Sequence, residues 1–501
     1  MSEHKELLQQ ADNFVAATQE DVNPRWYPQV HLAPAAGWIN DPNGISYFKG
    51  RYHAFFQHHP YSAQWGPMHW GHFSSEDLVT WKREPSALAP SEDYDLDGVW
   101  SGCALEHQGK LYVFYTGNRW ANGKDDGDGS IQRQCLAVSS DGQTFTKHGP
   151  VIESPQGISN FRDPKVWKQG EKWWMVLGVE TPEGRGQVWL YSSAELYTWE
   201  FDRVLYEDPD PDAFMIECPD FFEVDGKWVL VYSPMTSVRR EGYNQRNGHN
   251  TGYAVGNWTP GGDFEVLKSF AQFDFGHNFY ATQSMLAPDN RRLMFAWMGG
   301  FTLPLASQAE DGWSGHLATP REVSLSKDLE IIAIPIPEFN RLRENTIDKG
   351  AFTVDTDSTV EIASDLSIGE IELTVDLDKT SSEQVSLLVQ QTSADRYTEV
   401  AYDSLANRVI LDRGKSGSSD RGYRSAPYVG GAELKLRVII DRGSLEVFIN
   451  DGRYSLSSLA FPTEGKRGFS IASVGGVITV SDLKIHSLKS IWGDQVIIDG
   501  C

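Results

Sequence analysis

The sequence predicts an all-β protein, in which a five-bladed β-propeller is followed by a C-terminal β-sandwich. A short pattern of a turn, a basic or polar residue and an aromatic-rich apolar run recurs at residues 50–56, 109–115, 170–176, 226–232 and 290–296. Each copy is typical of a turn that leads into a short buried strand. Units of about sixty residues without helical patterns between their strands favour one four-stranded sheet per unit. A sandwich with coincidental spacing is the alternative.

The flanking segments differ in texture from the repeats. Residues 1–24 contain an amphipathic pattern and are predicted to form a helical lead-in to a propeller at residues 25–335. A linker is expected at residues 336–345. Strict alternation of apolar and polar residues then indicates half-buried antiparallel strands, and therefore a sandwich domain at residues 346–490. Residues 491–501 form a tail for which the sequence makes no structural prediction.

Composition excludes several classes of partner. The formal net charge is −25 and the pI is about 4.9, so a nucleic acid or an anionic membrane surface would be repelled. Four cysteines in 501 residues make no disulfide framework, which favours a reducing compartment. Because no signal-peptide core and no membrane-spanning run is present, we expect a cytoplasmic protein. A homo-oligomer is compatible with the sequence.

Three acids occupy similar places in successive repeats. Asp41, Asp163 and Glu217 lie seven to nine residues before the turns at Gly50, Gly170 and Gly226. In a propeller these positions belong to the innermost strands, so the acids are expected to converge at one end of the central channel. A proline follows each acid or its neighbour, which is typical of strand ends and bulges. Simple Asp-Pro turns are the alternative.

Converging carboxylates favour acid–base chemistry on a neutral substrate. Crowding raises the pKa of one carboxyl, which can then donate a proton at neutral pH while another stays charged. Glycoside hydrolysis needs this division of roles. The 17 Trp, 19 Tyr and 24 Phe residues include many that could form platforms for sugar rings, although each is individually more typical of a core. The predicted partner is therefore a small-molecule sugar.

Other patterns carry less weight. His58, His59, His69 and His72 lie close in sequence, but no metal-binding motif accompanies them, so no metal is predicted. The acidic loop at residues 125–129 lacks the glutamate of a calcium-binding loop, and no nucleotide-binding motif occurs, so no cofactor is expected. Arg239 and Arg240 are interpreted as surface charge, with a substrate phosphate as the alternative. Strand alternation predicts that the thiol of Cys218 points away from Glu217, into the sheet. A thiol that tunes the pKa of Glu217 is the alternative.

Several motifs together resemble one known family. WINDPNG at 38–44, WGPMHWG at 65–71, FRDP at 161–164, ECPD at 217–220 and DRGSLEVF at 441–448 resemble glycoside hydrolase family 32, the invertases and β-fructofuranosidases. The likeness covers nearly the whole chain and is strongest to intracellular bacterial enzymes of bifidobacterial type. It implies a propeller followed by a sandwich, and hydrolysis that retains the anomeric configuration.

The resemblance also implies a role for individual residues. Asp41 looks like the nucleophile that attacks C2 of the fructosyl unit, and Glu217 looks like the general acid and base. Asp163 would stabilise the transition state. Substrate-binding roles are implied for Asn40, Gln57, Trp65, Trp100, Ser101, Arg162, Tyr280 and Trp297.

Sucrose and short fructo-oligosaccharides are the expected substrates. Three alternatives stay open: hydrolysis of sucrose-6-phosphate, transfer of the fructosyl group to a sugar instead of water, and sugar binding without catalysis.

Overall fold

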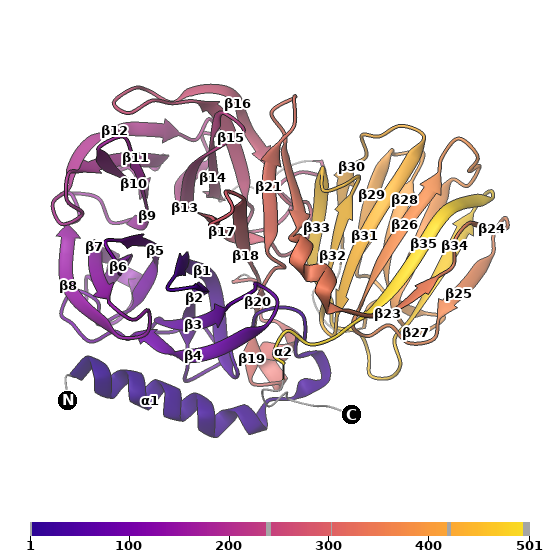
Figure 1. The fold of residues 1–501 in the computed structure, drawn as a ribbon, viewed down its shortest axis with the longest axis horizontal. Coiled ribbons are helices and arrows are strands. Elements are labelled where there is room, and N and C mark those ends of the chain that lie inside the picture. The colour runs from indigo at the N-terminus through magenta and orange to yellow at the C-terminus, as the bar shows by residue number, and fades with distance from the viewer. Residues whose placement is uncertain (1–2, 237–241, 302, 418–421, 494–501) are drawn as a thin grey trace.

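The computed structural model describes residues 3–236, 242–301, 303–417 and 422–493. These residues form two β-rich parts with seven sheets, five from the first part of the chain and two from the second (Figure 1). The all-β prediction is therefore confirmed. Among the helices of the described residues, none is long and apolar enough to cross a bilayer.

The first five sheets are formed by successive segments of the chain. The first contains β1 (Gly37–Phe48), β2 (Arg51–His59), β3 (His69–Ser75) and β4 (Trp81–Leu88). The second contains β5 (Val99–His107), β6 (Lys110–Trp120), β7 (Ser130–Ser139) and β8 (Phe145–Ile152). The third contains β9 (Phe161–Gln169), β10 (Lys172–Glu180), β11 (Gly186–Ser193) and β12 (Glu200–Glu207). The fourth contains β13 (Ala213–Val224), β14 (Lys227–Thr236), β15 (Gly252–Asn257) and β16 (Glu265–Gln272).

The fifth sheet is interrupted by an excursion of the chain. It is built from β17 (Tyr280–Leu286), β18 (Arg292–Met298), β21 (Arg321–Leu325) and β22 (Ile331–Pro335). Between β18 and β21 the chain forms α2 (Ala306–Glu310), β19 (Trp313–Ser314) and β20 (His316–Leu317). Strand β19 pairs in parallel with β1, so the last repeat is hydrogen-bonded to the first sheet.

The first strands of the five sheets lie innermost and contact one another in a closed circle (Figure 1). Strand β1 contacts β5 and β17, while β9 contacts β5 and β13, and β13 contacts β17. Each sheet starts at this centre and runs outward through hairpins. Residues at one level of the inner strands are therefore brought together although they are far apart in sequence.

The N-terminal helix α1 (Glu3–Thr18) occupies most of the range predicted to be helical, and it contacts the outer strand β4. Asp12 accepts a hydrogen bond from the backbone N–H of Ser86 at 3.0 Å, and His4 Nε2 accepts one from Ala89 at 3.1 Å. The helix thus covers part of a sheet edge that would otherwise be open to pairing with other chains. Short 3₁₀ segments η1 (Gln19–Asp21) and η2 (Pro24–Trp26) follow it.

The second part consists of two sheets that share one apolar core. One sheet contains β23 (Arg343–Asp348), β24 (Phe352–Val354), β26 (Gly369–Asp376), β31 (Glu433–Asp441), β32 (Ser444–Ile449), β33 (Tyr454–Leu459) and β35 (Ile478–Leu488). The other contains β25 (Thr359–Ala363), β27 (Gln384–Ser393), β28 (Arg396–Asp403), β29 (Arg408–Asp412), β30 (Tyr423–Pro427) and β34 (Gly468–Val474). The 3₁₀ segment η4 (Pro337–Leu342) joins this part to β22.

The chain returns to the first sheet after β35. The indole of Trp492 is buried, lies 5.8 Å from the ring of Phe73 and is covered by the guanidinium of Arg83 at 3.6 Å. The carbonyl of Ile491 accepts a hydrogen bond from the backbone of Trp81 at 2.8 Å. The start of the predicted tail therefore packs against the first part of the chain, while residues 494–501 lie outside the described residues.

A buried charge network holds the two parts of the chain together. His31 lies between two carboxylates of the second part, with Nδ1 2.8 Å from Asp441 Oδ2 and Nε2 3.0 Å from Glu446 Oε1. Arg321 of β21 donates to Glu446 at 2.6 Å and to Asp274 at 3.2 Å. Burial disfavours the charged imidazole, but the two carboxylates outweigh burial and raise the pKa of His31 to about 9.

Substituting His31 tests this contact. Because the pKa of His31 is raised, its contribution to stability is complete below pH 6.5 and is lost as the pH rises towards 9. The variant His31→Gln should lose about 3 kcal/mol at pH 6.5, since it leaves buried carboxylates with fewer partners, and the loss should shrink at pH 9. Calorimetric unfolding from pH 6 to 9 measures this. The exposed His148 provides the control, and an equal loss at both pH values would contradict the assignment.

Candidate functional site

The five inner strands all lose their hydrogen-bond register at the same level. The residues inside these breaks include Asp41, Ser101, Asp163, Cys218 and Ala281. Three of these have a positive φ, at 65° for Asp163, 48° for Cys218 and 54° for Ala281. A bulge of this kind changes the direction of a side chain relative to regular alternation. Regular alternation is therefore interrupted at these residues on all five inner strands.

Prolines stand where the ladder is interrupted. Pro164 and Pro219 fall inside the breaks on β9 and β13, and Pro42 is the residue at which pairing resumes on β1. Since proline has no N–H to donate, these positions can be left unpaired without the loss of a ladder hydrogen bond. The association of acid and proline in the sequence thus reflects the geometry of the inner strands.

The acids lie around one cavity of about 130 Å³. Its lining residues are Asn40, Asp41, Gln57, Trp65, Trp100, Ser101, Arg162, Asp163, Glu217, Tyr280 and Phe301. All three predicted acids and seven of the eight predicted substrate-binding residues are therefore brought together. The exception is Trp297, which is buried behind the cavity and whose ring lies 5.8 Å from Trp38 and 4.7 Å from Phe301.

Asp41 is buried and held by hydroxyl and amide donors. Ser101 Oγ donates to Asp41 Oδ2 at 2.6 Å, and Asn40 Nδ2 donates to Oδ1 at 3.0 Å. The indole N–H of Trp38 in turn donates to Asn40 Oδ1 at 2.7 Å. Burial raises the pKa of Asp41, and the charge of Glu217 adds to this, whereas the hydrogen bonds from Ser101 and Asn40 oppose it. The hydrogen bond from Ser101 thus holds Asp41 Oδ2 next to strand β5.

Glu217 has a different environment, because it is paired with a cation. Arg162 donates to Glu217 Oε1 through Nη2 at 2.8 Å and through Nε at 3.1 Å, and the hydroxyl of Tyr280 donates to Oε2. Burial favours the neutral acid, but the charge of Arg162 and these hydrogen bonds prevail, so the pKa of Glu217 is lowered. Asn160 and Gln132 accept from Arg162 Nη1 at 2.7 and 3.3 Å and hold the guanidinium in place.

Asp163 is the acid that keeps its proton near neutrality. Burial raises its pKa to about 7, and the charges of Glu217 and Asp41 add to this against the influence of Arg162. The backbone N–H of Asp163 donates to Thr116 Oγ1 at 3.0 Å. In the unliganded protein Arg162 and Tyr280 thus favour the ionised form of Glu217, whereas burial favours the protonated form of Asp163.

The prediction for Cys218 is wrong. Its thiol points towards the acids, at 3.5 Å from Asp41 Oδ2 and 3.6 Å from Asp163 Oδ2, and its backbone N–H donates to Asp163 Oδ2 at 2.8 Å. Regular alternation would turn it away, but the register break and the positive φ at this residue reverse its direction. Burial raises the pKa of the Cys218 thiol, so the neutral S–H lies between the two carboxyls.

Trp65, Trp100 and Trp120 form an aromatic cluster at the cavity, and the sequence predicted only part of it. Trp65, which is 42% exposed, lies 6.3 Å from Trp100 and 6.4 Å from Trp120 between ring centres. Neither Trp120 nor Phe301 was singled out from the sequence. The run that carries Trp120 resembled a buried strand, and Phe301 lies in an irregular segment after β18, so neither had a pattern that marked it.

The remaining sequence candidates lie apart from the acids. His58 and His69 are buried, and desolvation lowers their pKa values to about 4 and about 3, so both are neutral. Within the described ranges, no three histidine, cysteine, aspartate or glutamate side chains form a group that could hold a metal ion. Residues 125–128 of the acidic loop are exposed. Arg239 and Arg240 lie outside the described residues.

The raised pKa of Asp163 predicts a cost to stability. Between pH 4 and about 7 the unfolded chain loses this proton while the folded protein retains it, so stability falls as the pH rises. The variant Asp163→Asn should therefore match the wild type at pH 4 and exceed its Tm by about 2 °C or more at pH 8. Differential scanning calorimetry measures this.

Asp141 offers a control of opposite sign. Burial favours its neutral form, but backbone donors at Thr144 and Gln143 prevail and lower its pKa. Asp141→Asn should lose stability at pH 8. A Tm for Asp163→Asn that stays below that of the wild type at every pH would contradict the assignment.

Comparisons with known proteins agree with this architecture. The family model for the glycosyl hydrolases family 32 N-terminal domain matches residues 31–335, and that for the family 32 C terminal matches residues 338–487. A sucrose-6-phosphate hydrolase of Escherichia coli is 40% identical over 470 residues, covering 94% of this chain and 96% of the relative. A raffinose invertase of the same organism is also 40% identical over 470 residues, covering 91% of this chain and 94% of the relative.

A solved structure is similar over almost the whole chain. The GH32 beta-fructofuranosidase of Bombyx mori, in a mutant form in complex with sucrose, superposes with a TM-score of 0.84 at 32% identity, covering 96% of this chain and 98% of that one. Since the two family models together span both parts of the fold and the relatives are matched nearly end to end, the chain belongs to glycosyl hydrolase family 32.

Proposed function

We propose that this protein is a retaining β-fructofuranosidase, which releases terminal fructosyl units from sucrose and short fructo-oligosaccharides. The observation that carries the proposal is the meeting of Asp41, Asp163 and Glu217, from three different sheets, around one small polar cavity. Family membership and the substrates named for the relatives support the same activity. We further propose that the five sheets at residues 25–335 are the blades of a propeller and that residues 346–490 form a separate sandwich domain.

In the proposed reaction Asp41 and Glu217 act in two steps. Asp41 attacks C2 of the fructosyl unit and forms a covalent ester, while Glu217 donates a proton to the departing glycosidic oxygen. Glu217 then takes a proton from water, whose oxygen attacks C2 and releases fructose and free Asp41. Asp163 and Arg162 hold the fructose hydroxyls and stabilise positive charge at C2.

The proton has to reach Glu217 when substrate binds. In the unliganded protein Arg162 favours the ionised form of Glu217, whereas burial raises the pKa of Asp163 to about 7, so that Asp163 carries a proton part of the time near neutrality. A fructose hydroxyl that accepts from Arg162 would weaken its pair with Glu217 and so raise the pKa of Glu217. Cys218 lies between Asp41 and Asp163 as a neutral donor. We propose that substrate binding itself moves the acidic proton to the leaving-group side.

The roles of Asp41 and Glu217 can be separated with an activated fructoside, whose leaving group departs without protonation. On sucrose, Glu217→Ala should lose about 10²–10⁴-fold in kcat and Asp41→Ala about 10⁴-fold or more. On the activated fructoside, Glu217→Ala should release a burst of leaving group as the covalent ester accumulates. Asp41→Ala should give no burst. The exposed Asp125 is the control carboxylate, and a burst from Asp41→Ala would disprove the nucleophile assignment.

The hydroxyl of Ser101 should set the acidic limit of activity. Its hydrogen bond lowers the pKa of Asp41, so Ser101→Ala should raise that pKa and move the acidic limb of the kcat/KM profile upward by about 1 pH unit. Ser46→Ala, which removes a hydroxyl from β1 that bonds the carbonyl of Gly44, is the control. An unmoved limb would show that Asp41 does not set it.

Sucrose-6-phosphate is the second candidate substrate. The E. coli relative at 40% identity bears the name of a sucrose-6-phosphate hydrolase. Parallel kcat/KM values for sucrose, sucrose-6-phosphate and kestose distinguish the two functions. Product chromatography at high sucrose tests for transfer to sugar acceptors, and release of no sugar from any of the three would favour binding without catalysis.

We also propose that the protein acts in the cytoplasm. The three cysteines of the described residues, Cys103, Cys135 and Cys218, are buried free thiols. This supports a reducing compartment.

A further inference from the structure

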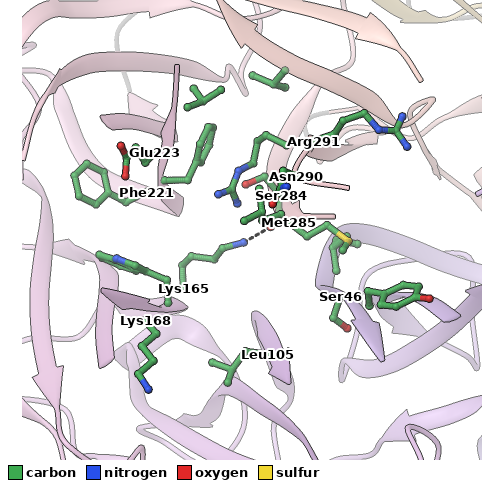
Figure 2. Close-up of a pocket in the computed structure, with 18 of the residues that line it drawn as sticks. Ser46, Leu105, Lys165, Lys168, Phe221, Glu223, Ser284, Met285, Asn290 and Arg291 are labelled. Atoms are coloured by element: carbon green, nitrogen blue, oxygen red, sulfur yellow. Dashed lines mark hydrogen bonds between the residues drawn. The ribbon is translucent and has the colours of Figure 1, made fainter. Parts of the chain in front are cut away.

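A second, larger cavity lies at the other end of the inner strands. It has a volume of about 960 Å³ and is lined by the later residues of β1, β5, β9, β13 and β17, together with residues at the start of β18 (Figure 2). None of its lining residues is shared with the cavity that holds Asp41, Asp163 and Glu217. The two cavities are therefore distinct, although the same strands carry both.

The innermost charges of this cavity include an ion pair. Lys165 of β9 lies 3.3 Å from Asp220 of β13, and its Nζ also donates to the carbonyl of Ser284 on β17 (Figure 2). Asp220 in addition accepts from the backbone N–H of Ser284. The carboxylate of Asp220 is thus paired with a lysine and accepts from a backbone donor, while its Oδ1 has no hydrogen-bond partner among the described residues.

Arg292 of β18 is a second cation without such a partner. Its Nε is buried and has no hydrogen-bond partner, and no carboxylate lies within 4 Å of its guanidinium among the described residues. Its contact is the ring of Phe222 at 4.7 Å. Burial lowers the pKa of Arg292, opposed in part by Asp220. Arg292 is half-buried, and the carboxylate of Asp220 that acts on it is already paired with Lys165. A partly desolvated cation without an ion pair of its own would gain from an anion supplied by solution.

Two further polar groups of the lining are also unsatisfied. Trp167 Nε1 and Ser284 Oγ are buried and have no hydrogen-bond partner in the described part of the chain. The cavity therefore combines an unpaired guanidinium with two other potential donors. An acceptor-rich ligand matches this set better than a neutral apolar one.

The charged residues nearer solvent limit the negative charge that a ligand of this cavity can carry. Glu106, Glu223 and Asp225 are exposed residues of the lining, and Lys168 is the exposed cation among them. Arg291 is engaged with Asp289 and Glu338 at 2.7 and 2.5 Å. These acids, in a chain of net charge −25, would repel a polyanion, whereas a small anion can be compensated by Arg292 and Lys165.

We propose that this cavity binds a small tetrahedral oxyanion, such as phosphate, at Arg292 and Lys165. A guanidinium presents parallel N–H donors that match two oxygens of a phosphate. The ammonium of Lys165, which pairs with the same Asp220 that acts on Arg292, adds charge without geometric demand. Lys165 lies two residues after Asp163 and Asp220 three residues after Glu217. The bound anion thus lies against the same strand segments that carry the candidate catalytic acids.

The test is a titration with inorganic phosphate at constant ionic strength, balanced with sodium chloride. Tryptophan fluorescence is the readout, because Trp167 and Trp228 line the cavity. We expect saturable binding to the wild type and binding about tenfold weaker, or absent, for Arg292→Met. Arg291→Met, at the adjacent arginine already engaged with carboxylates, should bind as the wild type does.

Several outcomes would overturn the proposal. One is an absence of saturable binding, and another is equal affinity in Arg292→Met and the wild type. Loss of binding in Arg162→Met with retention in Arg292→Met would place the anion in the other cavity. An equal response to chloride would overturn the oxyanion assignment. If Arg292→Met does not fold, Arg292→Lys keeps the charge but loses the parallel donors, and it should bind phosphate several-fold more weakly than the wild type.

Discussion

The shared break in the hydrogen-bond ladders of the five inner strands is the constraint on which the candidate site depends. A regular strand alternates its side chains between two faces, so regular ladders would place Asp41, Asp163 and Cys218 according to sheet packing alone. The bulges at these positions change the direction of the side chains, and the neighbouring prolines have no N–H that would need a ladder partner.

The same geometry produces the electrostatics of the site. Three carboxyls are brought into a small buried volume with one guanidinium, and all three cannot be charged at low cost. Arg162 and Tyr280 lower the pKa of Glu217, and desolvation raises that of Asp163 to about 7. The neutral thiol of Cys218 separates Asp163 from Asp41. A site poised in this way can respond to substrate through the loss of a single ion pair.

Between the two parts of the fold, buried charges are paired with one another and have a structural role. His31, Arg321, Asp441 and Glu446 form a buried network in which each carboxylate has several donors. Two hydrophobic clusters also contain residues of both parts. The second part thereby braces the first sheet and the last, and the closing residues Ile491 and Trp492 add a further anchor on the first sheet.

The sequence by itself determined those features of the fold that follow from a repeated pattern. Five aromatic-rich strand signals predicted the order of the sheets, and the equivalent placement of Asp41, Asp163 and Glu217 predicted that these acids would meet, because a repeated pattern places equivalent residues at one level. Strict alternation after residue 346 likewise predicted the second part. These inferences needed only local periodicity and register, which are properties of the chain itself.

Only the tertiary structure decided how single side chains are directed. The orientation of Cys218 depends on a bulge that no alternation rule contains, and Trp297 is withdrawn behind Phe301 by packing between β18 and the segment after it. Trp120 and Phe301 reach the site from segments without a distinctive pattern. The proton on Asp163 and the unpaired guanidinium of Arg292 follow from desolvation and from which neighbours lie within a few ångströms. Those distances join residues from different sheets, and only the closed fold sets them.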